Sequence, residues 1–384
     1  MKHKNVLEII NLYLSASIFI GEQFSYLKSQ GYNMHLICSP DDSLDSFAKK
    51  QGISYKAITL ERLPSFCKDI KAFIGICKYI RKNKIDTVIV HQDKAVLLGL
   101  LAARLMGVKN RIMFSHGVLY DTMHGIKKSI FILEDRFISK FATKDVCVSN
   151  SVAQSRLDYK VVKPSKQVIL NKGTCGGIDT INLFNPALYK SEELALLRNR
   201  LGISETDFIL GFCGRLVRDK GVIELLSAFD KLNKSYSGKT IKLLIIGFKE
   251  VRDTIPQSAI DIIENNQDII FTGAVSHDDI AKYYLLMDLF VLPSYREGFP
   301  TVILETAAMG VPSIVSRSTG CIDSIIENVT GIYTDITPDD IKNNIEKMLN
   351  DEVRLPMKKK CRDFTVNNFD HQVVWPHIVK TIEK

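Results

Sequence analysis

The sequence lacks a long apolar run, because no stretch reaches the ~18 residues that a membrane-spanning helix needs. The N-terminus, MKHKNVLEIINLY, has a charged start but no small-residue cleavage site, so we expect no signal peptide. A dinucleotide fingerprint is also missing, since LSASIFIG rather than G-x-G-x-x-G follows the first predicted strand. This absence counts against a dehydrogenase. No D-x-D motif lies at a suitable strand end.

Cysteine pairs of the kind that bind zinc or form redox motifs are absent. The eight cysteines show no C-x-x-C spacing and no regular framework. A disulfide scaffold and a zinc site are therefore unsupported. The pattern favours a reduced, cytoplasmic protein whose thiols are mostly buried.

The length of 384 residues suits two domains, and the content of 46% hydrophobic and 24% charged residues is typical of a folded protein. The net charge of +8 is unevenly placed: residues 1–173 carry 27 Lys+Arg against 14 Asp+Glu, whereas the remainder carries 24 against 29. The basic half indicates an anionic partner, either a membrane surface or nucleic acid, unless it is only a solvated face. Nucleic acid is disfavoured, because aromatics interleaved along a polar groove and a recognisable module are lacking.

The first half alternates predicted strands and helices, as expected of a doubly wound parallel sheet. Predicted helices include GEQFSYLKSQG, AVLLGLLAARLMG and the basic stretches at 66–84 and 124–144. We expect the apolar stripe of the last stretch to face the sheet mostly, and both basic helices to meet anionic lipid. The predicted strands cover residues 5–13, 33–39, 54–60, 86–92, 110–117, 144–149 and 167–173.

Two histidines end neighbouring predicted strands. His116 follows RIMFS and precedes a glycine, and His91 ends DTVIV. Carboxyl ends of parallel strands are where α/β sheets bind ligands, so His116 is a candidate site residue and His91 a weaker one.

The alternation restarts after residue 173, with strands predicted at 208–214 and 242–247. Arg215 and Lys220 lie in RLVRDKG between a strand and a helix, where cations and helix amides converge on anions. Ser276 is a plausible helix N-cap.

Residues 287–320 combine a buried strand, a polar loop and a helix. The loop SYREGFP carries Glu297 and Gly298, and the helix TVILETAAMG carries Glu305 eight positions after Glu297. Two helical turns would place both carboxylates on one side, where they would accept hydrogen bonds from hydroxyls beside the first-turn amides.

The pattern E-G-F-P-x-x-x-x-E resembles the E-x7-E signature of retaining glycosyltransferases of the GT4 family. RLVRDKG, FTGAVSHDDI, VPSIVSRSTG and the linker GTCGGIDTINLF resemble further motifs of that family, so the likeness covers nearly the whole chain. It implies the α/β GT-B fold, with two Rossmann-like domains facing a cleft and a C-terminal helix crossing back. The implied boundaries are 1–176 for the acceptor domain, 177–366 for the nucleotide-sugar domain and 367–384 for the returning helix.

The resemblance also implies roles for individual residues. Arg215 and Lys220 hold the donor diphosphate, main-chain groups near Val275 read the nucleobase, and His116 lies close to the transferred sugar. Glu297 orients the sugar and Glu305 binds ribose hydroxyls. His116 and Glu297 are thus the catalytic candidates, and the donor-binding candidates are Ser17, Gly21, Arg215, Lys220, Val275, Gly298, Phe299, Pro300, Thr301 and Glu305. Ser17 and Gly21 are placed in a loop after the first strand.

The sequence is also similar to bacterial transferases that extend lipid-diphosphate-linked oligosaccharides, including N-acetylgalactosaminyltransferases that act on undecaprenyl-diphosphate-linked sugars. This implies a UDP-sugar donor, a polyprenyl-diphosphate-linked acceptor, no cofactor or metal, no nucleic-acid partner, and a cytoplasmic protein peripheral on the inner face of the membrane. The transferred sugar would be a hexose or N-acetylhexosamine, with GalNAc or GlcNAc favoured, in O-antigen, capsule or glycan assembly. Alternatives are a hydrolysing UDP-sugar 2-epimerase of the same fold and a non-catalytic membrane-surface binding protein.

Overall fold

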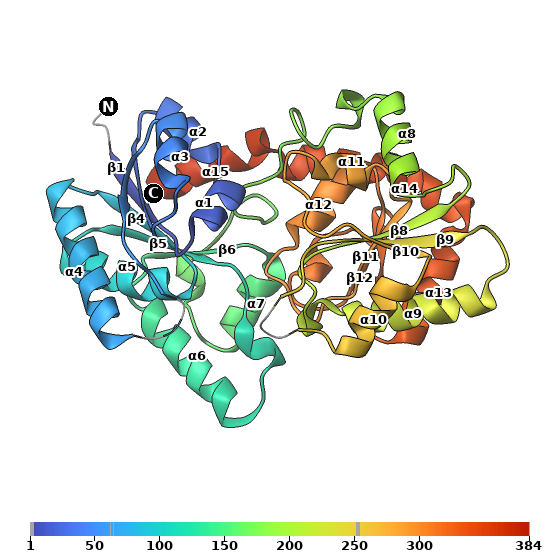
Figure 1. The fold of residues 1–384 in the computed structure, drawn as a ribbon. Coiled ribbons are helices and arrows are strands. Elements are labelled where there is room, and N and C mark those ends of the chain that lie inside the picture. The colour runs from blue at the N-terminus through green and yellow to red at the C-terminus, as the bar shows by residue number, and fades with distance from the viewer. Residues whose placement is uncertain (1–3, 62, 64, 251–253, 384) are drawn as a thin grey trace. The chain divides into compact units, whose positions relative to one another are not determined.

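The computed structural model describes residues 4–61, 63, 65–250 and 254–383. The chain forms two compact units, and each is a parallel sheet with helices on it (Figure 1). The first unit contains residues 1–177 and 372–384, and the second contains residues 178–371.

The sheet of the first unit has the strand order β3-β2-β1-β4-β5-β6-β7, and every recorded pairing in it is parallel. The order reverses between β1 and β4, which therefore form the topological switch point where α/β sheets place ligands. The strands are β1 (Asn5–Ile9), β2 (Asn33–Cys38), β3 (Ser54–Ala57), β4 (Thr87–His91), β5 (Asn110–Ser115), β6 (Lys144–Cys147) and β7 (Gln167–Ile169).

The helices of this unit alternate with its strands. They are α1 (Tyr13–Phe19), α2 (Gln23–Ser29), α3 (Leu44–Gln51), α4 (Phe66–Lys82), α5 (Asp93–Leu105), α6 (Gly125–Ser139), α7 (Asn150–Asp158) and α15 (His371–Glu383), with short 3-10 turns η1 (Leu119–Thr122) and η2 (Pro164–Lys166). Ser149 begins α7, because its hydroxyl accepts a hydrogen bond from the Val152 amide.

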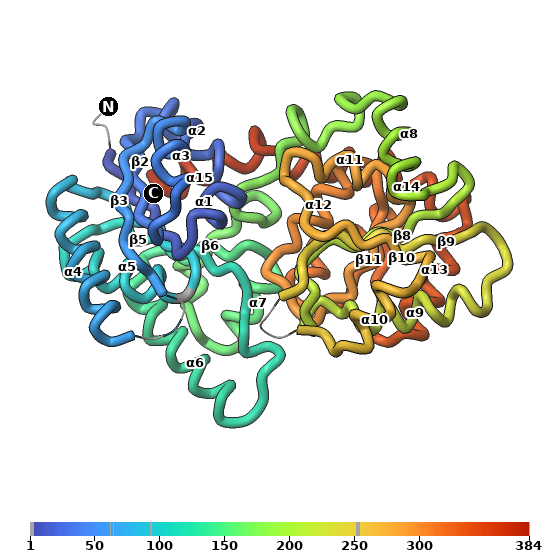
Figure 2. Tube along the Cα trace, in the orientation of Figure 1, coloured from blue at the N-terminus to red at the C-terminus, as the bar shows by residue number. Residues whose placement is uncertain are grey.

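The last helix, α15, completes the first unit. Figure 2 shows this red segment lying among the blue segments of the N-terminal sheet. Its contacts include hydrogen bonds from Lys144 to the Thr381 carbonyl (2.5 Å) and from Asn110 to the Ile382 carbonyl (2.9 Å). The Trp375 indole donates to the Gly176 carbonyl at 2.6 Å.

The second sheet has the order β10-β9-β8-β11-β12-β13, so its switch point lies between β8 and β11. Its strands are β8 (Phe208–Cys213), β9 (Ile241–Ile246), β10 (Ile269–Phe271), β11 (Leu289–Leu292), β12 (Ser313–Ser316) and β13 (Gly331–Thr334). Its helices are α8 (Ser191–Arg200), α9 (Val222–Ser235), α10 (Gln257–Asn265), α11 (Ile280–Tyr284), α12 (Thr301–Ala308), α13 (Pro338–Leu349) and α14 (Asp351–Phe369), with 3-10 turns η3 (Pro186–Leu188), η4 (Arg218–Lys220) and η5 (Cys321–Asp323).

The prediction of doubly wound parallel sheets is confirmed, and so is that of mostly buried thiols. Five of the eight unbonded cysteines are buried: Cys38, Cys147, Cys175, Cys321 and Cys361. Several strands end earlier than predicted, since β1 ends at Ile9 and β7 at Ile169.

The prediction that the α6 stripe mostly faces the sheet is wrong. Ile130, Leu133 and Phe137 are 56%, 60% and 53% exposed. One face of α6 packs inward, through Ile138 and the partly buried Ile132, while Ile126, Ile130, Leu133 and Phe137 follow helical spacing along the exposed face. Among the described residues, no helix combines the length and apolar character needed to cross a bilayer.

Candidate active site

Three loops at the carboxyl ends of β8, β11 and β12 are tied together in the second unit. The Ser294 hydroxyl and the Tyr295 amide both donate to the Asp219 carbonyl, at 2.9 and 2.8 Å. The Ser318 hydroxyl donates to the Ser294 carbonyl at 2.7 Å, and the Glu297 amide donates to the Thr319 carbonyl at 3.0 Å. The Ser318 hydroxyl therefore fastens the loop after β12 to the loop after β11.

Two glycines allow these loops to approach so closely. Gly221 has φ +67°, and a Cβ there would lie 2.1 Å from the Pro293 carbonyl oxygen. Gly320 has φ +81°, and its Cβ would lie 2.6 Å from the carbonyl oxygens of Glu297 and Gly298. Side chains at either position would be both strained and blocked.

Lys220 and Glu297 form an ion pair at the switch point of this sheet. Lys220 ends the turn after β8 and Glu297 lies in the loop after β11, so neighbouring strands bring the two together. Their side chains are only 19% and 12% exposed. Arg296 donates to Asp219 alongside, at 2.7 Å from its Nη2.

Glu305 lies in α12 and is bonded to a tyrosine that the sequence analysis did not single out. The Tyr284 hydroxyl donates to Glu305 Oε2 at 2.9 Å and lies 3.5 Å from Cys213 Sγ. Burial raises the pKa of Glu305, and hydrogen bonds from Tyr284 and Thr301 oppose that rise. His277, near enough to affect this carboxyl electrostatically, also contacts the Phe184 ring.

The geometric argument that linked the two glutamates is wrong. The helix α12 begins at Thr301, so Glu297 lies outside it and no run of two helical turns relates Glu297 to Glu305. Their contacts differ as well: Glu297 pairs with Lys220, whereas Glu305 pairs with Tyr284.

The other predicted donor-site residues lie around the Lys220–Glu297 and Tyr284–Glu305 pairs. Gly298 lies against Gly320, Pro300 caps α12, and Thr301 is its first residue. Phe299 is 9% exposed and its ring packs against Phe369 in a tilted arrangement, with centroids 5.4 Å apart. Its ring therefore belongs to the core, and its backbone is the part open to a ligand role.

Val275 and Arg215 lie in other loops of the second unit. Val275 lies in the loop after β10, and α11 begins at Ile280 rather than directly after Ser276, although the Ser276 hydroxyl accepts from the Asp279 amide. Arg215 is half-exposed and its Nη1 lies 3.4 Å from Glu250 Oε2, so Arg215 pairs with Glu250 and not with Glu297.

In the first unit, His116 follows β5 and touches a second histidine. The His116 Nε2 lies 2.9 Å from the Nδ1 of His91, and the His91 Nε2 lies 3.5 Å from Oε2 of Glu8. Burial lowers the pKa of both imidazoles to about 3 and raises the pKa of Glu8 to about 8. All three groups are thus neutral near pH 7. Sequence reasoning missed Glu8, whose signal is a lone carboxylate within the apolar strand NVLEI.

The prediction that Ser17 lies in an open loop is wrong. Residues 13–19 form α1, and the Ser17 hydroxyl donates to the Leu14 carbonyl at 3.0 Å inside it. Gly21 follows this helix with φ +46°, and a Cβ there would lie 2.8 Å from the Ser17 carbonyl oxygen. Gly21 therefore shapes the end of this helix.

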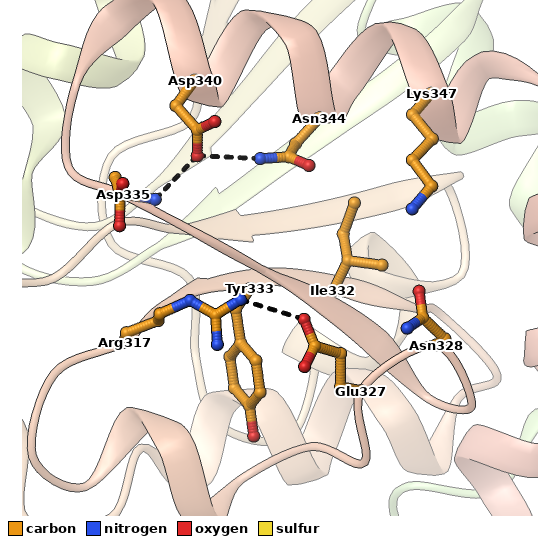
Figure 3. Close-up of a pocket in the computed structure, with 9 residues that line it drawn as sticks. All are labelled: Arg317, Glu327, Asn328, Ile332, Tyr333, Asp335, Asp340, Asn344 and Lys347. Carbon is orange, nitrogen blue, oxygen red and sulfur yellow. Dashed lines mark hydrogen bonds and ion pairs between the residues drawn. The ribbon is translucent and has the colours of Figure 1, made fainter.

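A separate polar hollow of about 310 Å³ lies beside β13 and α13 (Figure 3). The predicted site residues do not line it. Its polar groups bond to one another: Arg317 to Glu327 at 3.1 Å, and Asp340 Oδ2 to the Asp335 amide at 2.8 Å and the Asn344 amide at 3.0 Å. Across the described residues, no cluster of three or more His, Cys, Asp or Glu side chains could hold a metal ion.

The switch point of the second unit therefore offers a cation, a carboxylate and a buried carboxyl near the start of a helix. A cation and helix amides suit a phosphate, and carboxyl groups accept hydrogen bonds from sugar hydroxyls. The arrangement suits a ligand that carries both groups.

Two family models match the chain. The model of glycosyl transferases group 1 matches residues 195–368, and that of glycosyl transferase 4-like proteins matches residues 8–147. The two matches fall in different units of the structure.

Curated relatives match along most of their length. A capsular polysaccharide biosynthesis glycosyltransferase of Staphylococcus aureus is 27% identical, covering 98% of this chain and 96% of that protein. The UDP-Gal:alpha-D-GlcNAc-diphosphoundecaprenol alpha-1,3-galactosyltransferase of Escherichia coli is 26% identical over 94% of this chain and 90% of its own. An N,N'-diacetylbacillosaminyl-diphospho-undecaprenol alpha-1,3-N-acetylgalactosaminyltransferase of Campylobacter jejuni is 26% identical over 82% and 81%.

Among solved structures, a glycosyltransferase of Rickettsia africae superposes with a TM-score of 0.83 at 20% identity, covering 100% of this chain and 98% of that one. This likeness shows the fold. The matched models, the relatives and the shared fold agree, and the chain is a glycosyltransferase of the GT4 family with the GT-B fold.

Proposed function

We propose that the enzyme moves a hexose or N-acetylhexosamine, with GalNAc or GlcNAc favoured, from a UDP-sugar to a polyprenyl-diphosphate-linked sugar in O-antigen, capsule or glycan assembly. The observation that carries the donor half is the Lys220–Glu297 pair at the switch point of the second sheet, with Glu305 in the adjoining helix. The acceptor half is supported by the relatives from E. coli and C. jejuni, whose names specify diphosphoundecaprenol-linked acceptors.

In this proposal, breaking the bond between the sugar and its diphosphate leaves extra negative charge on the departing UDP. Lys220 supplies a fixed cation, and the amides at the start of α12 supply dipoles of the same sign. Because these groups meet the charge, the scheme requires neither a metal nor a cofactor. Arg215 is half-exposed and pairs with the partly exposed Glu250, so it can turn to the diphosphate when a donor binds.

The two glutamates take different tasks. Glu297 is held by Lys220 and orients the sugar, while Glu305 is held by Tyr284 and accepts ribose hydroxyls. Neither is free to act as the nucleophile of a double displacement. We therefore propose transfer with retention, in which the acceptor hydroxyl attacks on the face that the diphosphate leaves.

A donor panel tests this proposal. The purified chain is incubated with UDP- and GDP-sugars, with and without a synthetic sugar-diphosphate-polyprenol, and both nucleotide release and product mass are measured. We expect acceptor-dependent release of UDP and a product heavier by one sugar. Release of UDP without an acceptor would support the epimerase alternative, and donor binding without turnover would support the binding protein.

The first unit offers a surface for the lipid part of such an acceptor. The outer face of α6 exposes Ile126, Ile130, Leu133 and Phe137, and α4 exposes Phe66 at 82%. The helix α5 packs against both α4 and α6, so these helices lie on the same face of the sheet (Figure 1). Exposed lysines flank both stripes, including Lys71 and Lys127. We propose that this face rests on the anionic inner leaflet of the membrane.

Vesicle flotation tests this surface with a matched control. Leu133→Glu places a charge in the α6 stripe and should abolish binding to vesicles that contain anionic phospholipid. Leu196→Glu alters a leucine in α8 that is similarly exposed (70% against 60%) and should bind like the unaltered protein. Equal binding of both variants would contradict the proposal.

A further inference from the structure

Three ionisable side chains stand in a row across three neighbouring strands of the first unit. Glu8 lies in β1, His91 ends β4, and His116 follows β5. Glu8 and His91 are 1% and 3% exposed, whereas His116 is partly open. The family resemblance implies a task for His116, near the transferred sugar, and none for the two buried residues behind it.

The contacts in this row are specific to single atoms. His91 Nδ1 meets His116 Nε2 at 2.9 Å, so these two nitrogens must share one proton. At the other end, His91 Nε2 and Glu8 Oε2 face each other at 3.5 Å, and neither atom has any formed hydrogen bond within the described residues, so each is the nearest available partner of the other. The remaining ring nitrogen of His116, Nδ1, is not engaged by this row.

The surroundings of the row are apolar. The Phe114 ring stacks on the His91 ring with centroids 4.6 Å apart, and the Phe19 ring lies 6.4 Å from that of His116. The buried Cys175 thiol lies close enough to interact with Glu8, and burial raises the pKa of this thiol to about 12. Since no charged partner of the row is seen among the described residues, the row is most stable when every member is neutral.

The direction of one hydrogen bond in such a row fixes the others. If Glu8 is protonated and donates to His91 Nε2, then His91 carries its proton on Nδ1 and donates it to His116 Nε2. The proton of His116 then lies on Nδ1. If Glu8 is ionised, it can only accept, so His91 must carry its proton on Nε2, and His116 must donate from Nε2 and keep Nδ1 as an acceptor.

We propose that Glu8 and His91 are positioning residues that hold His116 in the Nδ1–H tautomer, so that His116 is a hydrogen-bond donor to an oxygen of its ligand. A donor suits the sugar hydroxyl and phosphate oxygens that a glycosyl transfer brings to this place. The identity of the ligand that accepts this hydrogen bond rests on the proposed function. The assignment of the tautomer does not.

The proposal predicts a dependence on pH whose sign follows from Glu8. Burial raises the pKa of Glu8 to about 8, so the donating form prevails below this pH and is lost above it. The two histidines stay neutral across this range, because their pKa values lie near 3. Transfer should therefore fall about tenfold for each pH unit above 8.

Histidine ¹⁵N spectroscopy of the full-length protein tests the tautomer without requiring activity. At pH 7 we expect His116 to carry its proton on Nδ1, and at pH 9.5 on Nε2. Glu8→Gln, whose amide can donate at any pH, should keep the Nδ1–H form at both values. His35, which pairs with Tyr79 elsewhere in this unit at 3.1 Å, serves as an internal reference that should not change. An Nε2–H tautomer of His116 at pH 7, or identical behaviour of Glu8→Gln and the unaltered protein at pH 9.5, would overturn the proposal.

The pH profile of transfer supplies a second readout. Glu8→Gln should lack the alkaline fall, whereas Glu134→Gln, which alters an exposed carboxylate of α6, should retain it. An alkaline fall that persists in Glu8→Gln would also overturn the proposal. If the spectra are as expected and no donor is transferred, the proposed function fails and the tautomer assignment stands.

Discussion

The two sheets share one strand order but use their switch points differently. In the first unit, Glu8 and His91 come from β1 and β4; in the second, Lys220 and Glu297 follow the corresponding strands β8 and β11. The first pair lies within the strands, is almost fully buried and is neutral. The second pair lies in loops beyond the strand ends, keeps some contact with solvent and is charged.

This difference shows that depth along the strand decides the charge of a switch-point pair. Glu8 and His91 lose their hydration inside the sheet and are neutral, which suits a device that directs hydrogen bonds. A pair past the strand ends keeps its charge, which suits the neutralisation of a phosphate. One topology therefore provides both kinds of chemistry.

The largest expected effect concerns the charges that remain inside the first unit. Arg156 is 3% exposed and bonds both Asp145 Oδ2 at 2.8 Å and Asp135 Oδ2 at 2.5 Å. Arg156→Met would leave Asp145 buried without its cation and should lower the free energy of unfolding by about 3–5 kcal/mol, measured by urea titration. Arg104→Met, at an exposed position of α5, should cost less than about 0.5 kcal/mol. Similar stabilities of the two variants would show that buried charge is not what holds this unit together.

The charged pair of the second unit is broken by Lys220→Ala. We expect transfer to fall by about 10²–10³-fold, as when one fixed donor to a developing anion is removed. Circular dichroism should show an unchanged fold. The matched control is Lys231→Ala, since Lys231 is a 46% exposed lysine that pairs with Asp339. Full activity of the Lys220→Ala variant would show that the Lys220–Glu297 pair does not contribute to the donor site.

The neutral state of the Glu8–His91 pair is tested by measuring the free energy of unfolding as a function of pH. Because the pKa of Glu8 is raised to about 8 in the folded chain, the folded state binds a proton that the unfolded state releases near its ordinary value, and stability is lost as pH rises from about 4.5 to 8. Glu8→Gln removes this loss. At pH 9 the free energy of unfolding of this variant should exceed that of the unaltered protein by on the order of a few kcal/mol. At pH 5 the two free energies should differ less. A difference that is constant with pH would contradict the assignment of a neutral Glu8.

The smallest expected effect tests how Glu305 is supported. Tyr284→Phe removes the hydroxyl that donates to Glu305 and should cost about 1 kcal/mol of stability and raise the KM for the donor several-fold. Tyr283→Phe, one residue earlier, loses only a contact with Arg200 at 3.2 Å and should leave the KM unchanged. If the two variants behave alike, Tyr284 does not orient Glu305.

The sequence predicts the sheets well because buried parallel strands are continuous apolar runs. It fails where the deciding interaction is distant in the chain. The stretch LSASIFIG contains no strong helix signal, yet it forms most of α1. The helix α6 has more apolar residues than one inward face can bury, and periodicity alone does not say which of them stay exposed. The partner of Lys220 lies 77 positions away, and only the sheet order brings it near.

The same limit applies to the candidate site. Lys220, Glu297 and Glu305 stand in motifs and were predicted, although the reason given for relating the two glutamates was wrong. Tyr284 and Glu8 stand in no motif. They become visible only when the fold shows that each is buried against another site residue.

The return of the chain to its first unit has a consequence for biosynthesis. Residues 372–384 supply α15, whose Val374, Ile378 and Ile382 are buried in that unit. Because a ribosome releases the C-terminus last, the unit that is begun first must be the last to be completed, after residues 178–371 have already left the exit tunnel. A nascent chain that lacks this final segment would carry a finished second unit and an N-terminal unit with an open apolar face, which is the kind of surface that chaperones bind.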